Sequence, residues 1–282
     1  MDHPSYPHAL DAIAAASCRT VPVGFPETAG WDLPGLQAAL RQTAPRLAYI
    51  VADFHNPTGR CMSEEQRARL VQAARKSRTL LVIDEALVDL GLDAPAPRPV
   101  TSHGREVVTL GSMSKSYWGG LRIGWVRGPT DLITRLAAVR TTVDLGSPVV
   151  EQLAAVELLA RPDDVLPQRV QGLAARRDRL LSLLAAQLPG WTAHSPPGGL
   201  SLWARLPAPV STAIAANAAR FGLRVAAGPR FGVGGAFEDH LRVPFTLSEP
   251  DLDAAVRTLS RTFQAVVALP AGTAVSSRGA VA

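Results

Sequence analysis

The sequence predicts an α/β protein with a mainly parallel sheet in the first half of the chain and a smaller α+β unit in the last third. Two patterns within the 282 residues lead to this prediction. Short apolar runs, typical of strands buried on both faces, alternate in part with amphipathic helices over the first half. After a long helical stretch, short strands alternate with helices again, which indicates a second unit.

Five apolar runs are predicted to form strands of the large sheet. They span residues 18–23, 47–52, 79–83, 107–110 and 121–126. Helices are expected between some of them, at residues 7–16, 33–42 and 63–76. The last of these helices opens with Ser63-Glu64-Glu65-Gln66, a capping box in which side chains satisfy the amides of the first turn.

Residues 148–187 are predicted to be helical, with a break at Arg161-Pro162, and to link two lobes. Beyond them, strands are expected at 200–205, 223–225 and 241–244, with helices at 211–220 and 249–265. The predicted domains are an incomplete large domain at 1–146 and, at 147–282, the linking helices with a small C-terminal domain. Residues 271–282 are expected to form a disordered tail.

The composition is typical of a soluble protein. With 47% hydrophobic and 19% charged residues, the chain can bury a sizeable core. It has no run of about 18 apolar residues that would predict a membrane span, and no basic segment that would open a secretion signal. Cys18 and Cys61 are too few for a disulfide framework, so we expect two packing residues, no metal site and a cytoplasmic location.

The net charge of +5 raises the question of nucleic acid. The basic residues are scattered, and the only dense groups are Arg75-Lys76-x-Arg78 and Arg176-Arg177-x-Arg179. Both lie on predicted amphipathic helices, where solvated faces explain them. The sequence contains no recognisable nucleic-acid-binding motif, so direct binding to nucleic acid is not expected.

Lys115 is the most informative residue, because only two of the 29 basic residues are lysines. An amine can lose its proton and attack a carbonyl, whereas guanidinium effectively cannot. Lys115 lies in Gly111-Ser112-Met113-Ser114-Lys115-Ser116, and these hydroxyls with Arg122 suit a phosphate monoester. The combination indicates pyridoxal phosphate, although an isolated Ser-x-Ser-Lys also fits an ordinary surface loop. The other lysine, Lys76, is expected to be a solvated helix end.

Two further segments place polar groups at the ends of predicted strands. Asn56 follows the strand at 47–52, at the edge where open α/β sheets bind ligands. Asp84 ends the apolar run at 79–83, and such a carboxylate can keep a pyridine nitrogen protonated. Taken alone, Asp84 could equally be a helix cap or a salt-bridge partner, and His55 beside Asn56 is expected to be an ordinary loop histidine.

The order of these motifs resembles the fold-type I pyridoxal phosphate enzymes of aminotransferase class I/II. The resemblance is greatest to the aminotransferase-like domain of MocR regulators, a branch of the GntR-type transcription factors. It runs from His3-Pro4-Ser5-Tyr6-Pro7 to Leu241-Arg242-Val243-Pro244-Phe245 and includes His55-Asn56-Pro57-Thr58-Gly59 and Arg122-x-Gly124. It implies a fold-type I large domain, a small C-terminal domain, pyridoxal 5′-phosphate and a homodimer.

The resemblance also assigns roles to residues of the site. Lys115 would form the internal aldimine, Asp84 would pair with the pyridinium, and Asn56 would donate to the ring 3′ oxygen. The phosphate would be held by Ser112, Ser114 and Arg122. Tyr6 matches the position whose ring stacks on the cofactor, and Arg242 would bind the substrate α-carboxylate. From the residues alone, Tyr6 could equally serve turn packing.

Two departures from the family are visible. Relatives have a tyrosine shortly after the aspartate, whereas Glu85-Ala86-Leu87-Val88-Asp89 contains none. In the family, the segment matching Met1-Asp2-His3-Pro4 lies well inside the large domain, after a Gly/Ser-rich turn that binds phosphate at a helix N-terminus. MocR proteins carry a winged helix-turn-helix further upstream. Three explanations are open: a misplaced start codon, a gene fragment, or a domain that works without part of its phosphate-binding segment. Of these, we expect a truncated copy.

Three functions follow from these patterns. The leading one is an aminotransferase that uses a primary amino acid and a 2-oxo acid, with Lys115 as the general base at the substrate Cα. The alternative is a non-catalytic effector domain of a MocR-type regulator, which senses cofactor or amino acid and has lost its DNA-binding head. A third is a remnant without function, which should expose apolar surface.

Overall fold

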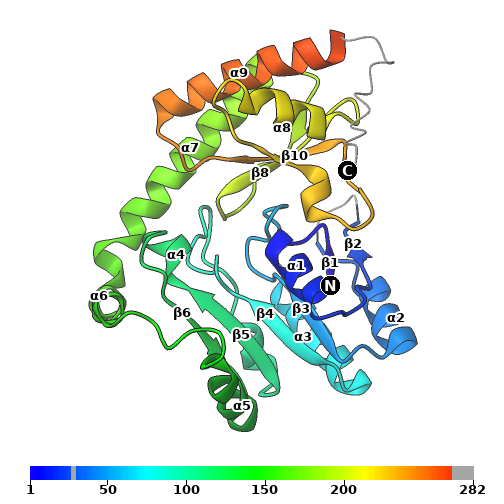
Figure 1. Cartoon of the computed structure of the whole chain (residues 1–282), viewed down its shortest axis with the longest axis vertical. Helices are drawn as coiled ribbons and strands as arrows, with labels where there is room; N and C mark the ends of the chain where they lie inside the picture. Colours follow the sequence, from blue (N-terminus) through cyan, green and yellow to red (C-terminus); the bar gives the residue numbers. More distant parts are fainter. Residues whose placement is uncertain (27–29, 269–282) are drawn as a thin grey trace, which may run out of the picture.

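The computed structural model describes residues 1–26 and 30–268 (Figure 1). It contains two four-stranded sheets, each with its own helices, and the chain passes from the lower to the upper sheet of Figure 1 through two helices. These are α6 (Val149–Ala160) and α7 (Leu166–Gln187), joined by the short 3-10 helix η2 (Pro162–Asp164). The predicted tail at 271–282 lies outside the described residues, and the predicted boundary between 146 and 147 stays a prediction.

The large sheet has the strand order β3-β4-β5-β6. Its strands are β3 (Leu47–Ile50), β4 (Leu80–Asp84), β5 (Val107–Ser112) and β6 (Gly124–Arg127). The first three are parallel, and β6 is antiparallel to β5. Because parallel strands end at the same edge, the segments that follow β3, β4 and β5 meet on one side of the sheet.

Helices and a short strand pair surround this sheet. The helices are α1 (Pro7–Ala15), α2 (Leu33–Thr43), α3 (Glu64–Ser77), η1 (Val100–His103), α4 (Met113–Ser116) and α5 (Thr130–Arg140). Strands β1 (Asp2–His3) and β2 (Val23–Gly24) form a separate parallel pair. The predicted capping box of α3 is confirmed, since Ser63 Oγ accepts from Gln66 N and Gln66 Oε1 accepts from Ser63 N.

The small sheet is antiparallel and has the order β7-β8-β10-β9. Its strands are β7 (Thr192–Ala193), β8 (Ser201–Arg205), β9 (Ala226–Ala227) and β10 (His240–Pro244), and its helices are α8 (Ser211–Ala219), η3 (Gly228–Phe231) and α9 (Glu249–Ala268). Apolar residues of α7, α8, α9 and the sheet form one core, which includes Leu180, Ile214 and Leu259. A second core, with Leu36, Ile50 and Leu70, lies between α2, α3 and the large sheet.

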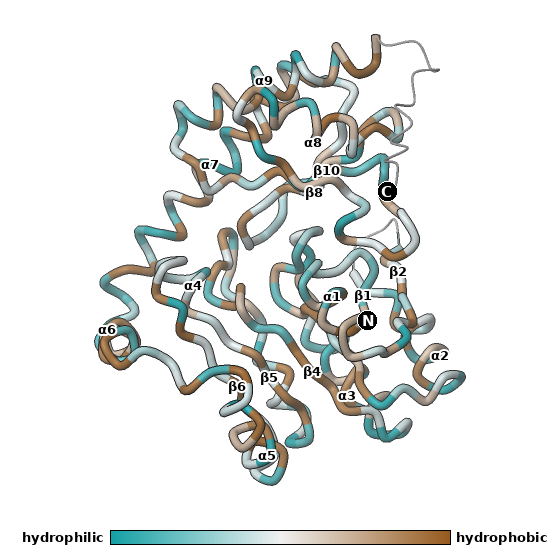
Figure 2. Tube along the Cα trace, in the orientation of Figure 1, coloured by the Kyte–Doolittle hydropathy of each residue, from teal (hydrophilic) through white to brown (hydrophobic). Residues whose placement is uncertain are grey.

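The hydropathy of the chain follows this arrangement (Figure 2). The strands β4 and β5 are largely hydrophobic along their length, whereas α7 and α9 alternate between hydrophilic and hydrophobic residues. This is the difference between a strand buried on both faces and a helix with one solvated side. No helix among the described residues is both long and apolar enough to cross a membrane.

Several predicted elements differ from the structure. Of the run at 18–23 only the last residue is in a strand, and the strand expected at 223–225 is found at 226–227 instead. The strand expected at 121–126 begins at Gly124, because Arg122 has a left-handed backbone with φ of 54° and cannot continue a strand. Helix α5 was missed.

Two predictions about individual side chains were wrong. Cys18 was expected to pack in the interior and is exposed, whereas Cys61 is half-buried against the core of the small lobe. Arg177 was expected on a solvated face of α7 and is buried, because the helix packs against other segments there. Its Nη1 donates to Asp93 Oδ1 and Pro196 O at 2.8 and 2.9 Å.

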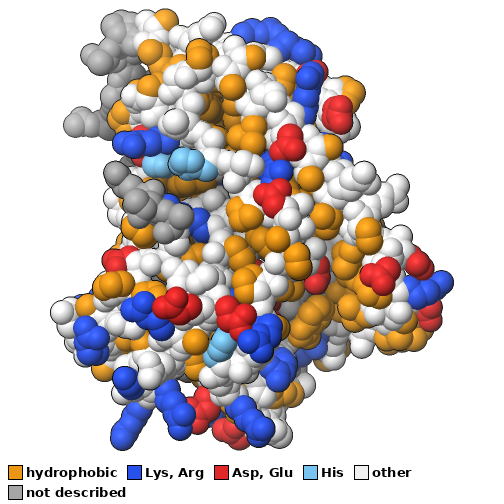
Figure 3. All heavy atoms as spheres, turned by 180° about the vertical axis from the view of Figure 1, so that it is seen from behind, with side chains coloured by type: hydrophobic (Ala, Val, Ile, Leu, Met, Phe, Trp, Pro, Cys, Tyr) orange, Lys and Arg blue, Asp and Glu red, His pale blue; other side chains and the backbone are white. Residues whose placement is uncertain are grey.

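Apolar side chains are exposed around β6, α5 and α6. They are Trp118, Trp125, Val126, Leu136, Val139, Val143, Leu145, Val149, Val150, Leu153, Val156 and Leu159, here called the apolar flank. Figure 3 shows the molecule from behind, with hydrophobic side chains gathered toward the side where α6 lies. Contiguous apolar surface of this extent is typical of a contact with another polypeptide.

Candidate active site

One cavity of about 280 Å³ lies at the carboxyl ends of β3, β4 and β5, and β10 of the small sheet closes it from the other side. All eight residues that the sequence singled out line this cavity: Tyr6, Asn56, Asp84, Ser112, Ser114, Lys115, Arg122 and Arg242. They come from segments up to 236 positions apart in the chain. The fold therefore brings the candidate set together, although the role of each residue remains a prediction.

The loop after β3 places Asn56 at the cavity. Its side-chain oxygen Oδ1 is buried and has no hydrogen-bond partner among the described residues. The loop is held by backbone bonds, from His55 N to Arg60 O at 2.7 Å and from Gly59 N to His55 O. Gly59 has a φ of +72°, and a Cβ there would lie 2.3 Å from Pro196 Cβ, so glycine is required at this close approach between the lobes.

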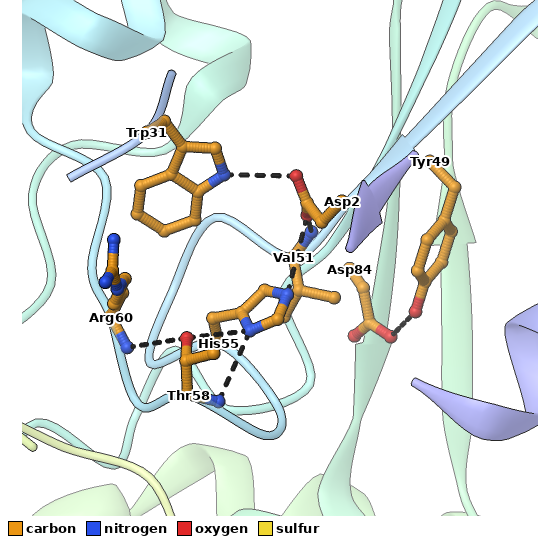
Figure 4. A network of polar contacts seen from close by, with 8 residues as sticks. All are labelled: Asp2, Trp31, Tyr49, Val51, His55, Thr58, Arg60 and Asp84. Carbon is orange, nitrogen blue, oxygen red and sulfur yellow. Dashed lines mark hydrogen bonds and ion pairs between the residues drawn. The ribbon is translucent and has the colours of Figure 1, made fainter. Parts of the chain in front are cut away.

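A buried polar network supports this loop from behind (Figure 4). Asp2 of β1 accepts a hydrogen bond from Trp31 Nε1 at 3.1 Å and another from Val51 N at 2.9 Å. His55 Nε2 lies 3.7 Å from Asp2 Oδ2, and His55 Nδ1 lies 3.0 Å from Thr58 Oγ1. His55 was expected to be an ordinary loop histidine; it is buried in the network and also lines the cavity.

Burial sets the charge states in this network. It raises the pKa of Asp2 to about 6, although hydrogen bonds from Val51 N and Trp31 oppose the shift. Burial lowers the pKa of His55 to about 3, and the positive charge of Arg60 adds to the effect. At neutral pH the network therefore contains a neutral imidazole beside a carboxylate that would gain its proton in mild acid.

Asp84 is the last residue of β4, and both of its carboxylate oxygens accept a hydrogen bond. Tyr49 Oη donates to Asp84 Oδ2 at 2.5 Å (Figure 4). Ala86 N donates to Asp84 Oδ1 at 2.9 Å. Burial and the negative charge of Asp84 raise the pKa of the Tyr49 phenol, so the phenol stays protonated and remains the donor. Each carboxylate oxygen has a second lone pair available to a ligand in the cavity.

Lys115 lies on the short helix α4, directly after β5. Ser112 caps this helix, because its Oγ accepts from Ser114 N at 3.3 Å. Arg169 of α7 donates to the backbone oxygen of Lys115 at 2.8 Å. The helix that carries Lys115 is therefore held at its start by the Ser112 cap and at Lys115 by Arg169, and Lys115 lines the cavity.

Cationic groups lie at two places on the cavity wall. Arg122 follows α4, on the side of Ser112 and Ser114, whereas Arg242 comes from β10 of the small sheet. Arg242 Nε is buried without a hydrogen-bond partner among the described residues, and burial lowers the pKa of the guanidinium. A guanidinium remains charged in proteins, so this unpaired donor favours an anionic ligand group.

Sequence reasoning missed several residues of the site. Tyr49 looked like part of an apolar strand, and its contact with Asp84 depends on the register between β3 and β4. Four further lining residues are apolar or small and carry no motif of their own: Phe54, Leu87, Leu200 and Ser201. Ala86 and Leu87 line the cavity where relatives were expected to have a tyrosine.

Comparison with known proteins identifies the family. Residues 1–259 match the model of aminotransferase class I and II. The chain belongs to this family. The predicted fold-type I α/β architecture is confirmed as well, because the structure superposes on LysN, the α-aminoadipate aminotransferase of Thermus thermophilus, with a TM-score of 0.87 and 25% identity. That match covers 95% of this chain and 71% of LysN.

The relatives include both enzymes and regulators. Capreomycidine synthase of Streptomyces vinaceus is 31% identical over 91% of this chain and 66% of its own length. YisV of Bacillus subtilis, described as an uncharacterized HTH-type transcriptional regulator, is 32% identical over 72% of this chain and 43% of its own length. The chain thus spans less than two thirds of the length of either relative. The predicted likeness to both aminotransferases and helix-turn-helix regulators is confirmed.

Pyridoxal 5′-phosphate is the cofactor of this family, and the residues present fit it. The cavity offers the amine of Lys115 for the aldehyde of the cofactor and the carboxylate of Asp84 for its ring nitrogen. The hydroxyls of Ser112 and Ser114, with the guanidinium of Arg122, suit its phosphate. Among the described residues, Arg242 Nε is a buried donor without a hydrogen-bond partner, which is costly unless a ligand accepts from it.

Proposed function

We propose that this chain binds pyridoxal 5′-phosphate through Lys115 and transfers an amino group between a primary amino acid and a 2-oxo acid. The observation that supports this most is that Lys115, Asp84 and Arg242 all line one cavity between the two sheets. Each supplies a different chemical property: a nucleophilic amine, a fixed carboxylate and an anion-binding guanidinium. Such a convergence is typical of a catalytic site.

The proposed contacts of the cofactor use the residues already described. Ser112, Ser114 and Arg122 would hold the phosphate, and Asp84 would receive the ring nitrogen. The ring oxygen would be bound by the side-chain amide of Asn56, and Tyr6 would cover one face of the ring. Burial, with the charge of Asp84, raises the pKa of the Tyr6 phenol, so this ring would remain a neutral stacking surface.

The chain's own groups would then carry the proton transfers. When bound, the cofactor supplies an electron sink for the bonds at the substrate Cα. Arg242 would bind the substrate α-carboxylate and so orient the Cα–H bond toward Lys115. Lys115 Nζ would take the proton from Cα and return it one position away, acting first as a base and then as an acid.

Turnover tests this proposal. Purified protein with pyridoxal 5′-phosphate, an amino acid and 2-oxoglutarate should produce the corresponding 2-oxo acid continuously. Lys115→Ala should abolish production, because no other lysine of the chain lies on the cavity wall described by the structure. Lys76→Ala is the matched control, since Lys76 lies on the exposed last turn of α3, and it should leave the rate unchanged. Equal activity of wild type and Lys115→Ala would contradict the proposal.

A regulator is the second candidate, and the similarity to YisV favours it. In that case the cavity would bind cofactor and amino acid, and a change in the position of the lobes would be transmitted to a DNA-binding partner. Turnover separates the two functions. A stable complex with amino acid and no 2-oxo acid would favour the regulator, whereas repeated turnover would favour the enzyme.

We also propose that two copies of the chain associate in the cytoplasm through the apolar flank. Val143 is 80% exposed and Val150 is 75% exposed, which is unusual for side chains of this kind on a solitary protein. Light scattering coupled to size exclusion should give the mass of a dimer. Val150→Glu, which introduces a charge in the middle of the flank, should shift the mass toward the monomer.

A further inference from the structure

We propose that Tyr49 is the positioning residue for Asp84, and that its hydroxyl fixes the carboxylate that receives the ring nitrogen of the cofactor. This inference rests on the proposed function and goes beyond it, because Tyr49 itself does not line the cavity of about 280 Å³. It instead lines a second, apolar cavity of about 690 Å³, which shares Tyr6, Asp84 and Leu110 with the first. Tyr49 therefore acts on Asp84 from behind.

The strand register explains why this contact forms. Tyr49 of β3 lies opposite Val82 of β4, so Asp84 is two residues further along on the same face of the sheet. A diagonal neighbour of this kind is within reach of an aromatic side chain. The phenol donates to Asp84 Oδ2 at 2.5 Å. Figure 4 shows its hydroxyl pointing toward the Asp84 carboxylate.

The contact has the properties of a fixed support. Tyr49 is only 7% exposed, and its ring has few rotatable bonds, so the hydroxyl has little freedom to leave Asp84. Because Ala86 N donates to the other oxygen, the plane of the carboxylate is set by two donors that come from different segments. Loss of the phenol would leave the backbone amide alone and allow the carboxylate to turn.

The orientation of the Asp84 carboxylate matters because it would bind a single atom of the cofactor, the ring nitrogen. A charge-assisted hydrogen bond to a ring nitrogen depends on direction as well as distance. Ala86 and Leu87, which line the cavity just after Asp84, have no side-chain donor that could hold the carboxylate from the front. The only side chain among the described residues that hydrogen-bonds Asp84 is Tyr49.

Binding of two matched ligands tests the inference. We would measure the affinity of wild type and Tyr49→Phe for pyridoxal 5′-phosphate and for 1-deazapyridoxal 5′-phosphate, in which C–H replaces the ring nitrogen. Both ligands carry the same aldehyde and phosphate, and only the first presents a ring nitrogen to Asp84. Tyr49→Phe should lower the affinity for pyridoxal 5′-phosphate about tenfold, which is the size expected for one hydrogen bond to a charged group. It should change the affinity for the deaza analogue by less than about twofold.

A double-mutant cycle checks that Tyr49 works through Asp84. Adding Tyr49→Phe to Asp84→Asn should cost no further affinity for pyridoxal 5′-phosphate, because the partner is already altered. Tyr117→Phe is the control for loss of a buried phenol. Its hydroxyl makes no hydrogen bond to any residue that the structure describes, so both affinities should remain those of wild type.

The outcomes separate this inference from the function on which it rests. If Tyr49→Phe weakens both ligands equally, its effect is a general loosening of the site and the inference is overturned. Unchanged affinity for both ligands would overturn it too. If wild type binds neither ligand, the proposed function fails together with the inference. Thermal unfolding of each variant shows whether the protein compared is folded.

Discussion

The buried ion pair beneath the Asn56 loop gives a quantitative prediction about stability. Arg67 of α3 and Asp53 at the start of the loop are both 0% exposed, and Arg67 Nη2 lies 2.6 Å from Asp53 Oδ1. Arg67 Nε also donates to Met62 O at 2.9 Å. Burial raises the pKa of Asp53 in spite of the opposing charge of Arg67, so without the guanidinium a buried carboxylate would stand alone.

We expect Arg67→Met to lower the free energy of unfolding by about 4 kcal/mol. Removal of one partner of a buried pair costs about 3–5 kcal/mol, because the other charge is left uncompensated. Urea unfolding followed by circular dichroism measures the change. Arg69→Met is the control on the same helix, since Arg69 lies 3.8 Å from Glu65 in an exposed pair, and it should cost less than about 1 kcal/mol.

A double variant tests the physical reason. Asp53→Leu combined with Arg67→Met removes both charges and should recover most of the loss. A loss below about 1 kcal/mol for Arg67→Met alone would refute the reasoning, because it would mean that water or another group compensates Asp53. Since Asp53 lies three positions before Asn56, we also expect the single variant to bind pyridoxal 5′-phosphate more weakly.

Three further predictions follow from the same region. The pKa of His55 is lowered to about 3 in the folded protein, so its contribution to the free energy of unfolding is present above the unfolded pKa of about 6.5 and is lost as the pH falls. The total loss is on the order of 5 kcal/mol. His55→Gln should therefore make the free energy of unfolding depend less on pH between 6.5 and 3. Burial of Asp2 acts in the opposite sense, because its pKa of about 6 makes its contribution to the free energy of unfolding fall as the pH rises from about 4 to 6. Asp2→Asn should remove this pH dependence in the same titration. Ser63→Ala, which removes the side-chain half of the capping box, should lower the free energy of unfolding by about 1 kcal/mol in urea, whereas Ser77→Ala at the other end of α3 should cost less.

Much of the site could be predicted from the sequence because its chemistry is local. Lys115 among serines, Asn56 after one strand and Asp84 at the end of the next are each recognisable within a few residues. The parallel strands then bring these segments to one edge of the sheet, so the order of the motifs along the chain was sufficient to place them together.

The parts that were missed depend on long-range packing. The contact of Tyr49 with Asp84 requires the register of β3 on β4, and the burial of Arg177 requires the position of Pro196 on another segment. Strands of two residues, such as β1 and β9, are too short for any periodicity. Cys18 was misplaced because an apolar run was taken for a buried strand, whereas residues 18–22 lie outside any strand.

The most direct test of the account is the position of the covalent attachment. Purified protein would be saturated with pyridoxal 5′-phosphate, reduced with borohydride, digested and mapped by mass spectrometry. We predict a saturable absorption band before reduction and a single pyridoxyl label on Lys115. The absence of a saturable band, or a label distributed over Lys76 and the amino terminus, would contradict the claim that this cavity is a pyridoxal phosphate site.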